Sequence, residues 1–162
     1  DYAGARGEDV DATAIHRRKS DLFQEMMRDE GLTLRPGIAD IVEIARSGAV
    51  RLAWVTTTGR DNLDAYLAAL SPALSEDDFD LVTDASMVEA GKPDPAIYSL
   101  ALERTGLPAD AVVAVEDTPE CLAAATGAGL AAVAFPNEAA AGRDFPGAEA
   151  RVDRLAPAAL GL

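Results

Sequence analysis

Hydrophobic residues recur along this chain in two alternating patterns, short continuous runs and stripes at helical spacing. Short apolar runs bounded by polar or turn-forming residues are typical of strands buried in a sheet. Such runs occupy residues 51–55, 79–82, 112–115, 130–135 and, as an edge strand, 150–155. Between them, apolar residues recur every three or four positions, which predicts amphipathic helices. Strands that alternate with helices predict an α/β fold with a doubly wound parallel sheet.

A longer stripe at helical spacing precedes the first of these strands. It spans residues 12–30 and predicts an amphipathic helix that ends at Gly31. The apolar positions of the stripe are Ile15, Leu22, Phe23, Met26 and Met27. Residues 34–37 are predicted to form a turn into a second helix. Residues 1–11 are rich in Gly, Ala and acidic residues without periodicity, which indicates a loop or linker.

Composition narrows the class of protein. With 162 residues, 49% of them hydrophobic, the chain has room for one domain with a sizeable core. Its formal net charge of -14 argues against a nucleic-acid or membrane partner, because both need a broad basic face. The single cysteine, Cys121, and the single histidine, His16, exclude a disulfide framework and a Cys- or His-rich metal cluster. Without a long apolar run or an apolar signal core, the expected location is the cytoplasm. The expected oligomeric state is a monomer.

Polar residues suited to catalysis or metal binding follow the predicted strands at their carboxyl ends. Thr56 follows the first strand, Lys92 lies in a GKPDP loop, and Glu116 and Asp117 end a later strand. In an open parallel sheet these ends meet at one edge, where ligands bind. Paired carboxylates suit Mg²⁺ that also binds phosphate oxygens. Taken singly, each feature has an ordinary structural explanation: a helix N-cap for Thr56, a solvated loop for Lys92 and a solvated turn for the carboxylates.

The order of these motifs resembles the haloacid dehalogenase superfamily. An apolar strand ending in threonine, a GKPDPAIY loop and a strand ending in ED before an Ala-rich helix are similar to the superfamily's second, third and fourth motifs. The stretches IHRRKSDLFQEMM, LRPGIADIVE and RLAWVTTTGRDN resemble its CbbY-like branch, whose members dephosphorylate sugar phosphates and bisphosphates. The resemblance covers nearly all of residues 14–155 and implies a Rossmann-like core.

The resemblance implies a role for each strand-end residue. Thr56 would bind a phosphoryl oxygen, with Thr57 adding contacts beside it. Lys92 would hold the attacking carboxylate and the transferring phosphoryl group and neutralise developing charge. Asp117, with Glu116, would hold Mg²⁺ between the enzyme and the phosphate.

The resemblance also divides the chain into two parts. Residues 1–34 would be the C-terminal part of a mobile helical cap, and residues 35–162 the core. His16, Lys19 and Arg35 become candidates for binding the far phosphate or the hydroxyls of a substrate, since an acidic protein must place its few cations where anions bind. The alternative is a solvated helix face with a salt bridge at the hinge.

One motif of the superfamily has no convincing match in this chain. The chemistry needs an aspartate nucleophile at the end of a central strand, with a second aspartate two residues on as acid and base. The pattern DVDAT at residues 9–13 follows no apolar strand and is interpreted as a coincidence. We therefore expect the first central strand to be absent. Unpaired backbone groups in the sheet interior cost about 1 to 3 kcal/mol each, so the chain alone should be poorly stable or should close the gap differently. Without the nucleophile, it should also be inactive.

The leading hypothesis from the sequence is a Mg²⁺-dependent phosphatase of small phosphorylated sugars that works through an aspartyl-phosphate, with the nucleophile outside this chain. A phosphotransferase similar to β-phosphoglucomutase is the first alternative. The second is a catalytically silent domain that binds phosphate without turnover. Cys121 falls where the superfamily commonly has glycine, and its expected role is that of a small buried residue.

Overall fold

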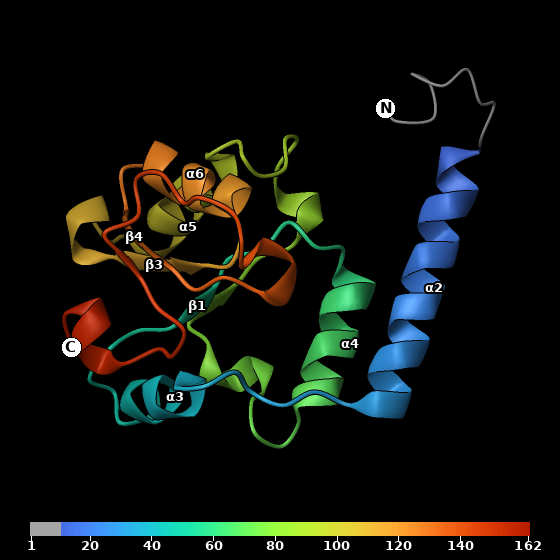
Figure 1. Ribbon diagram of the computed structural model, residues 1–162, viewed down its shortest axis with the longest axis horizontal. Helices are drawn as coiled ribbons and strands as arrows, with labels where there is room; N and C mark the ends of the chain where they lie inside the picture. Colours follow the sequence, from blue (N-terminus) through green and yellow to red (C-terminus); the bar gives the residue numbers. More distant parts are fainter. Residues whose placement is uncertain (1–10) are drawn as a thin grey trace.

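The computed structural model describes residues 11–162 as a layered α/β arrangement with one helix, α2, at its margin (Figure 1). The helices are α2 (Ala12–Glu30), α3 (Ile38–Arg46), α4 (Arg60–Leu70), α5 (Ala96–Thr105) and α6 (Pro119–Gly127). The strands are β1 (Ala53–Trp54), β2 (Leu81–Val82), β3 (Val113–Glu116), β4 (Ala131–Ala134) and β5 (Ala150–Arg151). The loop predicted over residues 1–11 lies outside the described range except for Asp11. The predicted α/β class is confirmed.

The strands form two parallel sheets. One consists of β1 and β2, and the other has the order β3-β4-β5. Val113 pairs with Ala131 in the register of β3 and β4, and Ala53 pairs with Leu81 in that of β1 and β2. Among the described residues, β1 and β3 each have a strand partner on one side only. That a central strand is missing between them remains a prediction.

Strand β1 is shorter than the predicted run over residues 51–55 because side chains replace ladder bonds at both of its ends. The Leu52 amide donates to the Asp80 carboxylate at 2.9 Å. Beyond the strand, the Thr56 amide donates to the Thr83 hydroxyl, also at 2.9 Å.

Strand β5 is also shorter than the predicted edge strand over residues 150–155. The Val152 amide still donates to the carbonyl of Ala134, on β4. The Leu155 amide, however, donates to the carbonyl of Pro36 at 3.0 Å. The chain has therefore left the sheet edge by residue 155 and joins the segment before α3.

Helices cover both faces of the larger sheet (Figure 1). On β3, Ala114 faces a buried cluster with α5 and α6, whereas its neighbour Val115 packs with Phe135 and the α3 residue Ile41. Alternation of side chains between two apolar clusters requires helices on both sides. The doubly wound arrangement predicted from the sequence is thus confirmed.

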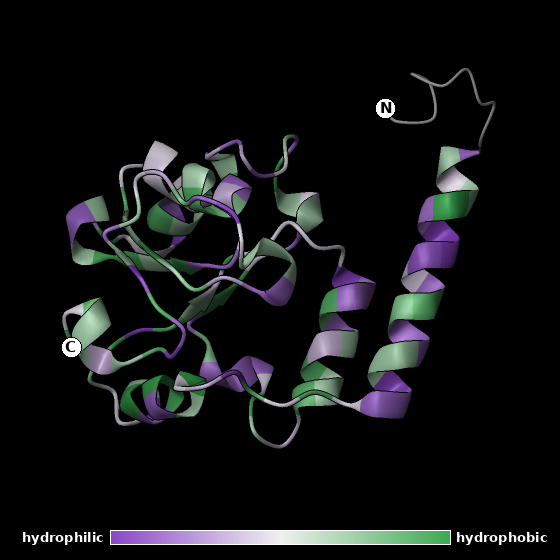
Figure 2. Ribbon diagram, in the orientation of Figure 1, coloured by the Kyte–Doolittle hydropathy of each residue, from purple (hydrophilic) through white to green (hydrophobic). Residues whose placement is uncertain are grey.

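The predicted helix over residues 12–30 is confirmed, but its apolar stripe is mostly not covered. Asp11 accepts a hydrogen bond from the Ala14 amide at 2.9 Å and caps the start of α2. Met27 is its one buried residue, and Ile15 is 56% exposed. Apolar bands therefore remain along the helix (Figure 2). The role of Asp11 as a cap agrees with the interpretation of DVDAT as a coincidence.

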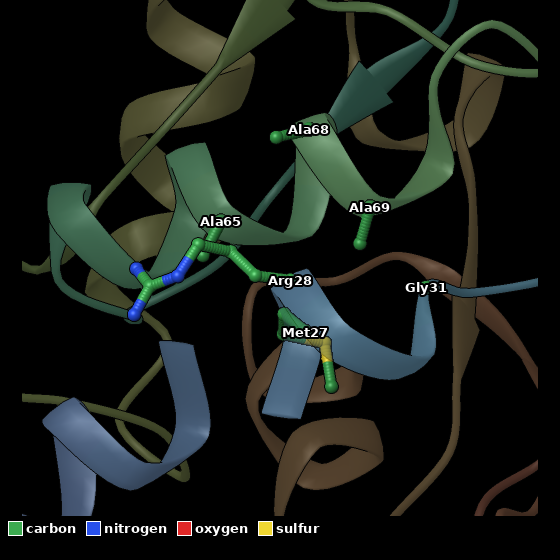
Figure 3. A pocket seen from close by; sticks show the side chains of 6 residues that line it. All are labelled: Met27, Arg28, Gly31, Ala65, Ala68 and Ala69. Atoms are coloured by element: carbon green, nitrogen blue, oxygen red, sulfur yellow. The ribbon is translucent and has the colours of Figure 1, made fainter. Parts of the chain in front are cut away.

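The C-terminal part of α2 packs against α4 (Figure 3). A shallow cavity between the two helices is lined by Met27, Arg28, Gly31, Ala65, Ala68 and Ala69. The rings of Phe23 and Tyr66 are tilted against each other with 4.7 Å between their centroids, and the Tyr66 ring in turn lies 6.2 Å from that of Trp54 on β1. Aromatic contacts thus connect α2 to the smaller sheet. The assignment of residues 1–34 to a cap and of residues 35–162 to a core remains a prediction.

Candidate active site

Lys92 connects the carboxyl ends of β1 and β3. Its Nζ donates to the carbonyl oxygen of Val55 at 2.9 Å and pairs with Glu116 Oε1 at 2.5 Å. The side chains of Lys92 and Glu116 are each only 9% exposed. The lysine therefore lies between the two sheets, with its charge neutralised by a buried carboxylate. Burial without a partner would be costly for either group.

The loop that carries Lys92 is fixed from both sides. After it, the Asp94 side chain accepts a hydrogen bond from the Ala96 amide at 2.9 Å, as expected of a residue that caps α5. Before it, Gly91 lies beside the threonine turn, because a Cβ built on Gly91 would be 3.7 Å from Thr57 Oγ1. The second and third motifs are therefore adjacent in space, as predicted.

Glu116 has a second hydrogen-bond donor. The hydroxyl of Tyr98, on α5, donates to the same oxygen, Oε1, that Lys92 contacts. Lys92 Nζ also lies 4.7 Å from the centroid of the Tyr98 ring. Burial, with the nearby Glu116 carboxylate, raises the pKa of Tyr98 well above its usual range. The phenol is thus a hydrogen-bond donor throughout the physiological pH range.

Asp117 follows Glu116 and is half-buried at the carboxyl end of β3. Asn137 Nδ2 donates to Asp117 Oδ2 at 2.8 Å and so fixes one carboxylate oxygen. Thr118 caps α6 by accepting from the Cys121 amide at 3.3 Å. Carboxylate oxygens at the start of a helix are stabilised by its N-terminal dipole.

Three potential metal ligands converge here. Single donor atoms of Glu116, Asp117 and Cys121 all lie within 4.8 Å of one another. The two carboxylates offer the oxygen ligands that Mg²⁺ prefers. Burial raises the pKa of the Cys121 thiol, which agrees with the expected small, partly buried residue rather than a reactive thiolate. The donor set therefore fits a site in which the carboxylates hold a hard cation.

The threonine turn is held by a buried hydroxyl. Thr83, at 1% exposure, accepts from the Thr56 amide and donates to the Thr56 carbonyl, both at 2.9 Å. The Thr56 hydroxyl accepts from the Thr58 amide at 3.0 Å. Thr56 thus organises the turn before α4, but it is not the helix N-cap of its structural explanation, because α4 begins at Arg60 with Gly59 as its N-cap. Its contact with a phosphoryl oxygen stays a prediction.

Arg35 binds carbonyl oxygens that follow β4. Its Nη1 donates to the Phe135 carbonyl at 2.8 Å and its Nη2 to the Pro136 carbonyl at 2.6 Å. The guanidinium also lies 3.5 Å from the centroid of the Phe135 ring. The residue therefore attaches the segment before α3 to the core through carbonyls and a ring, not through the carboxylate of a hinge salt bridge. Substrate binding by Arg35 remains a prediction.

The two candidates on α2 lie apart from this cluster. His16 and Lys19 are exposed, and within residues 11–162 no hydrogen bond or ion pair joins either of them to the strand ends. Lys19 lines a shallow surface hollow with Ile15, Arg18 and Leu22. Their role in substrate binding is therefore also a prediction.

Sequence reasoning missed three polar residues that organise the site: Thr83, Tyr98 and Asn137. Tyr98 ends the GKPDPAIY motif, but nothing in the motif indicates that it contacts Glu116. A weak signal existed for Thr83, since it directly follows a predicted strand. No local pattern marks Asn137, whose contact spans twenty residues.

Comparison with known proteins decides the family. The model of the haloacid dehalogenase-like hydrolase family matches residues 2–129. The chain belongs to this family. Protein CbbY of Cereibacter sphaeroides is 37% identical over 142 residues, which are 88% of this chain and 62% of that protein. Protein CbbY of Rhodobacter capsulatus is 35% identical over 156 residues, 96% of this chain and 69% of that protein. The chain thus belongs to the CbbY-like branch and spans under 70% of these relatives' length.

Comparison with solved structures agrees with this family assignment. The crystal structure of CbbY from Rhodobacter sphaeroides in complex with phosphate has a TM-score of 0.85 and 36% identity, covering 94% of this chain and 70% of that one. A second structure holds a variant of that protein in complex with xylulose-1,5-bisphosphate, with a TM-score of 0.81 and 37% identity over 88% and 63% of the two chains. Among the described residues of our chain, no helix combines the length and apolarity needed to cross a membrane.

Proposed function

We propose that this chain is the larger part of a Mg²⁺-dependent phosphatase of small phosphorylated sugars. The observation that carries the proposal is Lys92, which joins the end of β1 to Glu116 beside Asp117. A buried ammonium group next to paired carboxylates suits a reaction in which negative charge develops on a transferring phosphoryl group. The relatives named CbbY, one of them bound to a sugar bisphosphate, support this class of substrate.

Each residue has a part in the proposed reaction. Lys92 binds and orients phosphoryl oxygens and stabilises their charge, and Thr56 and Thr57 add hydrogen-bond donors. Asp117, together with Glu116, holds the cation. Bound Mg²⁺ supplies charge neutralisation for the phosphate. We propose that the aspartate nucleophile comes from outside residues 11–162, on a strand that pairs with the free edges of β1 and β3. His16, Lys19 and Arg35 remain candidates for binding the rest of the sugar.

The experiment uses the full-length natural protein. Phosphate release from sugar phosphates and bisphosphates, xylulose-1,5-bisphosphate included, is measured with Mg²⁺ and with a chelator. Lys92→Ala is expected to lower kcat by about 10²- to 10³-fold, in the range of other losses of a charge-stabilising group. Arg104→Ala, which removes an exposed cation at the end of α5, is the matched control and should leave kcat unchanged.

Three results would contradict the proposal. Unchanged turnover in Lys92→Ala would remove the basis for assigning a phosphatase. Interconversion of sugar phosphates without net phosphate release would favour the phosphotransferase, which uses the same core. Saturable phosphate binding without any turnover would favour the silent binding domain.

A further inference from the structure

Tyr98 contacts both charged groups at the centre of the site. Its hydroxyl donates to Glu116 Oε1, and its ring lies under Lys92, with 4.7 Å between Nζ and the centroid. The tyrosine is 5% exposed, and the side chains of Lys92 and Glu116 are 9% exposed. The three side chains therefore form one buried unit, although Tyr98 comes from α5, Glu116 from β3 and Lys92 from a loop.

Both donors of this unit use the same carboxylate oxygen. Lys92 Nζ and the Tyr98 hydroxyl each bind Glu116 Oε1, and neither contacts Oε2. Two donors that bind one oxygen from different directions restrict rotation of the Glu116 carboxylate about its Cγ–Cδ bond. They also leave Oε2 as the oxygen that remains available to another ligand.

The hydroxyl does more than the packing of α5 requires. The Tyr98 ring belongs to the apolar cluster that contains Ile97, Ala114 and Leu122, and a phenylalanine ring would fill the same space. What a phenylalanine cannot supply is the hydrogen bond to Glu116. Among the described residues, loss of that bond leaves Lys92 as the one donor to Oε1.

We propose that Tyr98 is a positioning residue that holds Glu116 for divalent-cation binding. This inference rests on the proposed function and deepens it, because it names a residue outside the carboxylate pair that sets the affinity for the cation. Partners that orient metal-binding carboxylates typically change metal affinity or activity by 10- to 100-fold when they are removed. The Tyr98 hydroxyl binds Glu116 directly, so we expect its loss to act on cation affinity through that carboxylate.

The test measures cation affinity directly. Mn²⁺, followed by its solution EPR signal and displaced with Mg²⁺, is titrated into the full-length natural protein carrying Tyr98→Phe, Thr105→Val or Asp117→Asn. We expect Tyr98→Phe to raise the Kd by about 10-fold. Thr105→Val is the control, since it removes from the other end of α5 a hydroxyl that donates to the Ala101 carbonyl, and it should change the Kd by less than twofold.

A second variant separates positioning from packing. Glu116→Gln removes the charge that the cation needs but keeps an oxygen acceptor for Tyr98. In that background, Tyr98→Phe should cause no further loss of affinity, because the two residues act through one ligand. A further loss would contradict the proposal.

The outcomes distinguish this inference from the function on which it rests. If the parent chain shows no saturable Mn²⁺ binding that Asp117→Asn removes, the cation site and the proposed function both fail. If binding depends on Asp117 but is the same in Tyr98→Phe, only the positioning role is overturned. Failure of Tyr98→Phe to fold would also overturn it, since the ring alone is then not sufficient for packing.

Discussion

Helices α6 and α2 show how differently this chain uses two apolar segments. Leu122 on α6 is completely buried, with sheet residues of β3 and β4 against it, whereas Leu22 on α2 is 48% exposed. Met27 alone is buried on α2, where the helix meets α4. An apolar stripe at helical spacing is sufficient to predict a helix, but its burial requires another layer of structure on the same side.

The two sheets show a related difference. Strand β3 pairs with β4 over four residues and lies between apolar clusters on both faces. Strand β1 pairs with β2 over two residues, and side chains complete the hydrogen bonding at its ends. We therefore expect the larger sheet to depend on packing and the smaller sheet to depend on particular polar side chains.

The largest expected difference in stability is between matched leucine substitutions on α6 and on α2. Leu122→Ala should lower the free energy of unfolding by about 2 to 5 kcal/mol, because it leaves a cavity in a fully buried cluster. Leu22→Ala makes the same chemical change at an exposed position and should cost less than about 0.5 kcal/mol. Urea unfolding followed by circular dichroism measures both. Similar losses for the two variants would show that α2 is covered in solution.

A medium effect is expected at the smaller sheet. Thr83→Val keeps the side-chain volume but removes the hydroxyl that serves both the amide and the carbonyl of Thr56. The free energy of unfolding should fall by about 1 to 3 kcal/mol, the usual cost of unsatisfied buried polar groups. Thr33→Val, at an exposed position, is the control. Equal stability of the two variants would mean that the Thr83 hydroxyl is dispensable.

A smaller, pH-dependent effect is expected where α3 meets the 3-10 helix η1 (Glu76–Asp78). Asp78 binds Arg46 Nε at 2.7 Å and accepts from the Ser75 amide at 2.8 Å. The Arg46 guanidinium, aided by Ser75, lowers the pKa of Asp78 to about 2 from its ordinary value near 3.8. Ionised Asp78 therefore contributes fully to the free energy of unfolding above pH 3.8, and this contribution is lost as the pH falls to about 2.

Asp78→Asn should accordingly lower the free energy of unfolding at pH 7 by about 1 kcal/mol, as for a lost cap. The difference from the parent chain should shrink between pH 4 and pH 2 in denaturant titrations. Asp153→Asn, at an exposed position, serves as the control. A difference that stays constant down to pH 2 would rule out the pairing with Arg46 as its cause.

The smallest effect is expected at the cation site itself. Cys121→Ser replaces a sulfur near the two carboxylates with an oxygen. Mg²⁺ prefers oxygen ligands, and Glu116 and Asp117 already supply them. The Kd for Mg²⁺, measured by displacement of Mn²⁺, should therefore change by less than twofold. A tenfold rise in the Kd would indicate that the Cys121 sulfur is a ligand.

Local pattern in the sequence was sufficient for most of the elements. Helix α2 has the predicted bounds because its stripe, its Asp11 cap and its terminal Gly31 are all short-range features. The positions of β3 and β4 and the placement of polar residues at strand ends also follow from sequence. The lengths of β1 and β5 do not, because Asp80 and Pro36 supply hydrogen-bond partners that no local pattern reveals.

The sequence by itself determined which residues stand at the strand ends and, through their order, the family to which the chain belongs. Tertiary structure alone decided that Lys92 reaches both Val55 and Glu116, and that Tyr98 and Asn137 hold the two carboxylates. These contacts join residues 18 to 37 positions apart. Helical and strand periods act over a few residues, whereas such partners meet only when the layers pack.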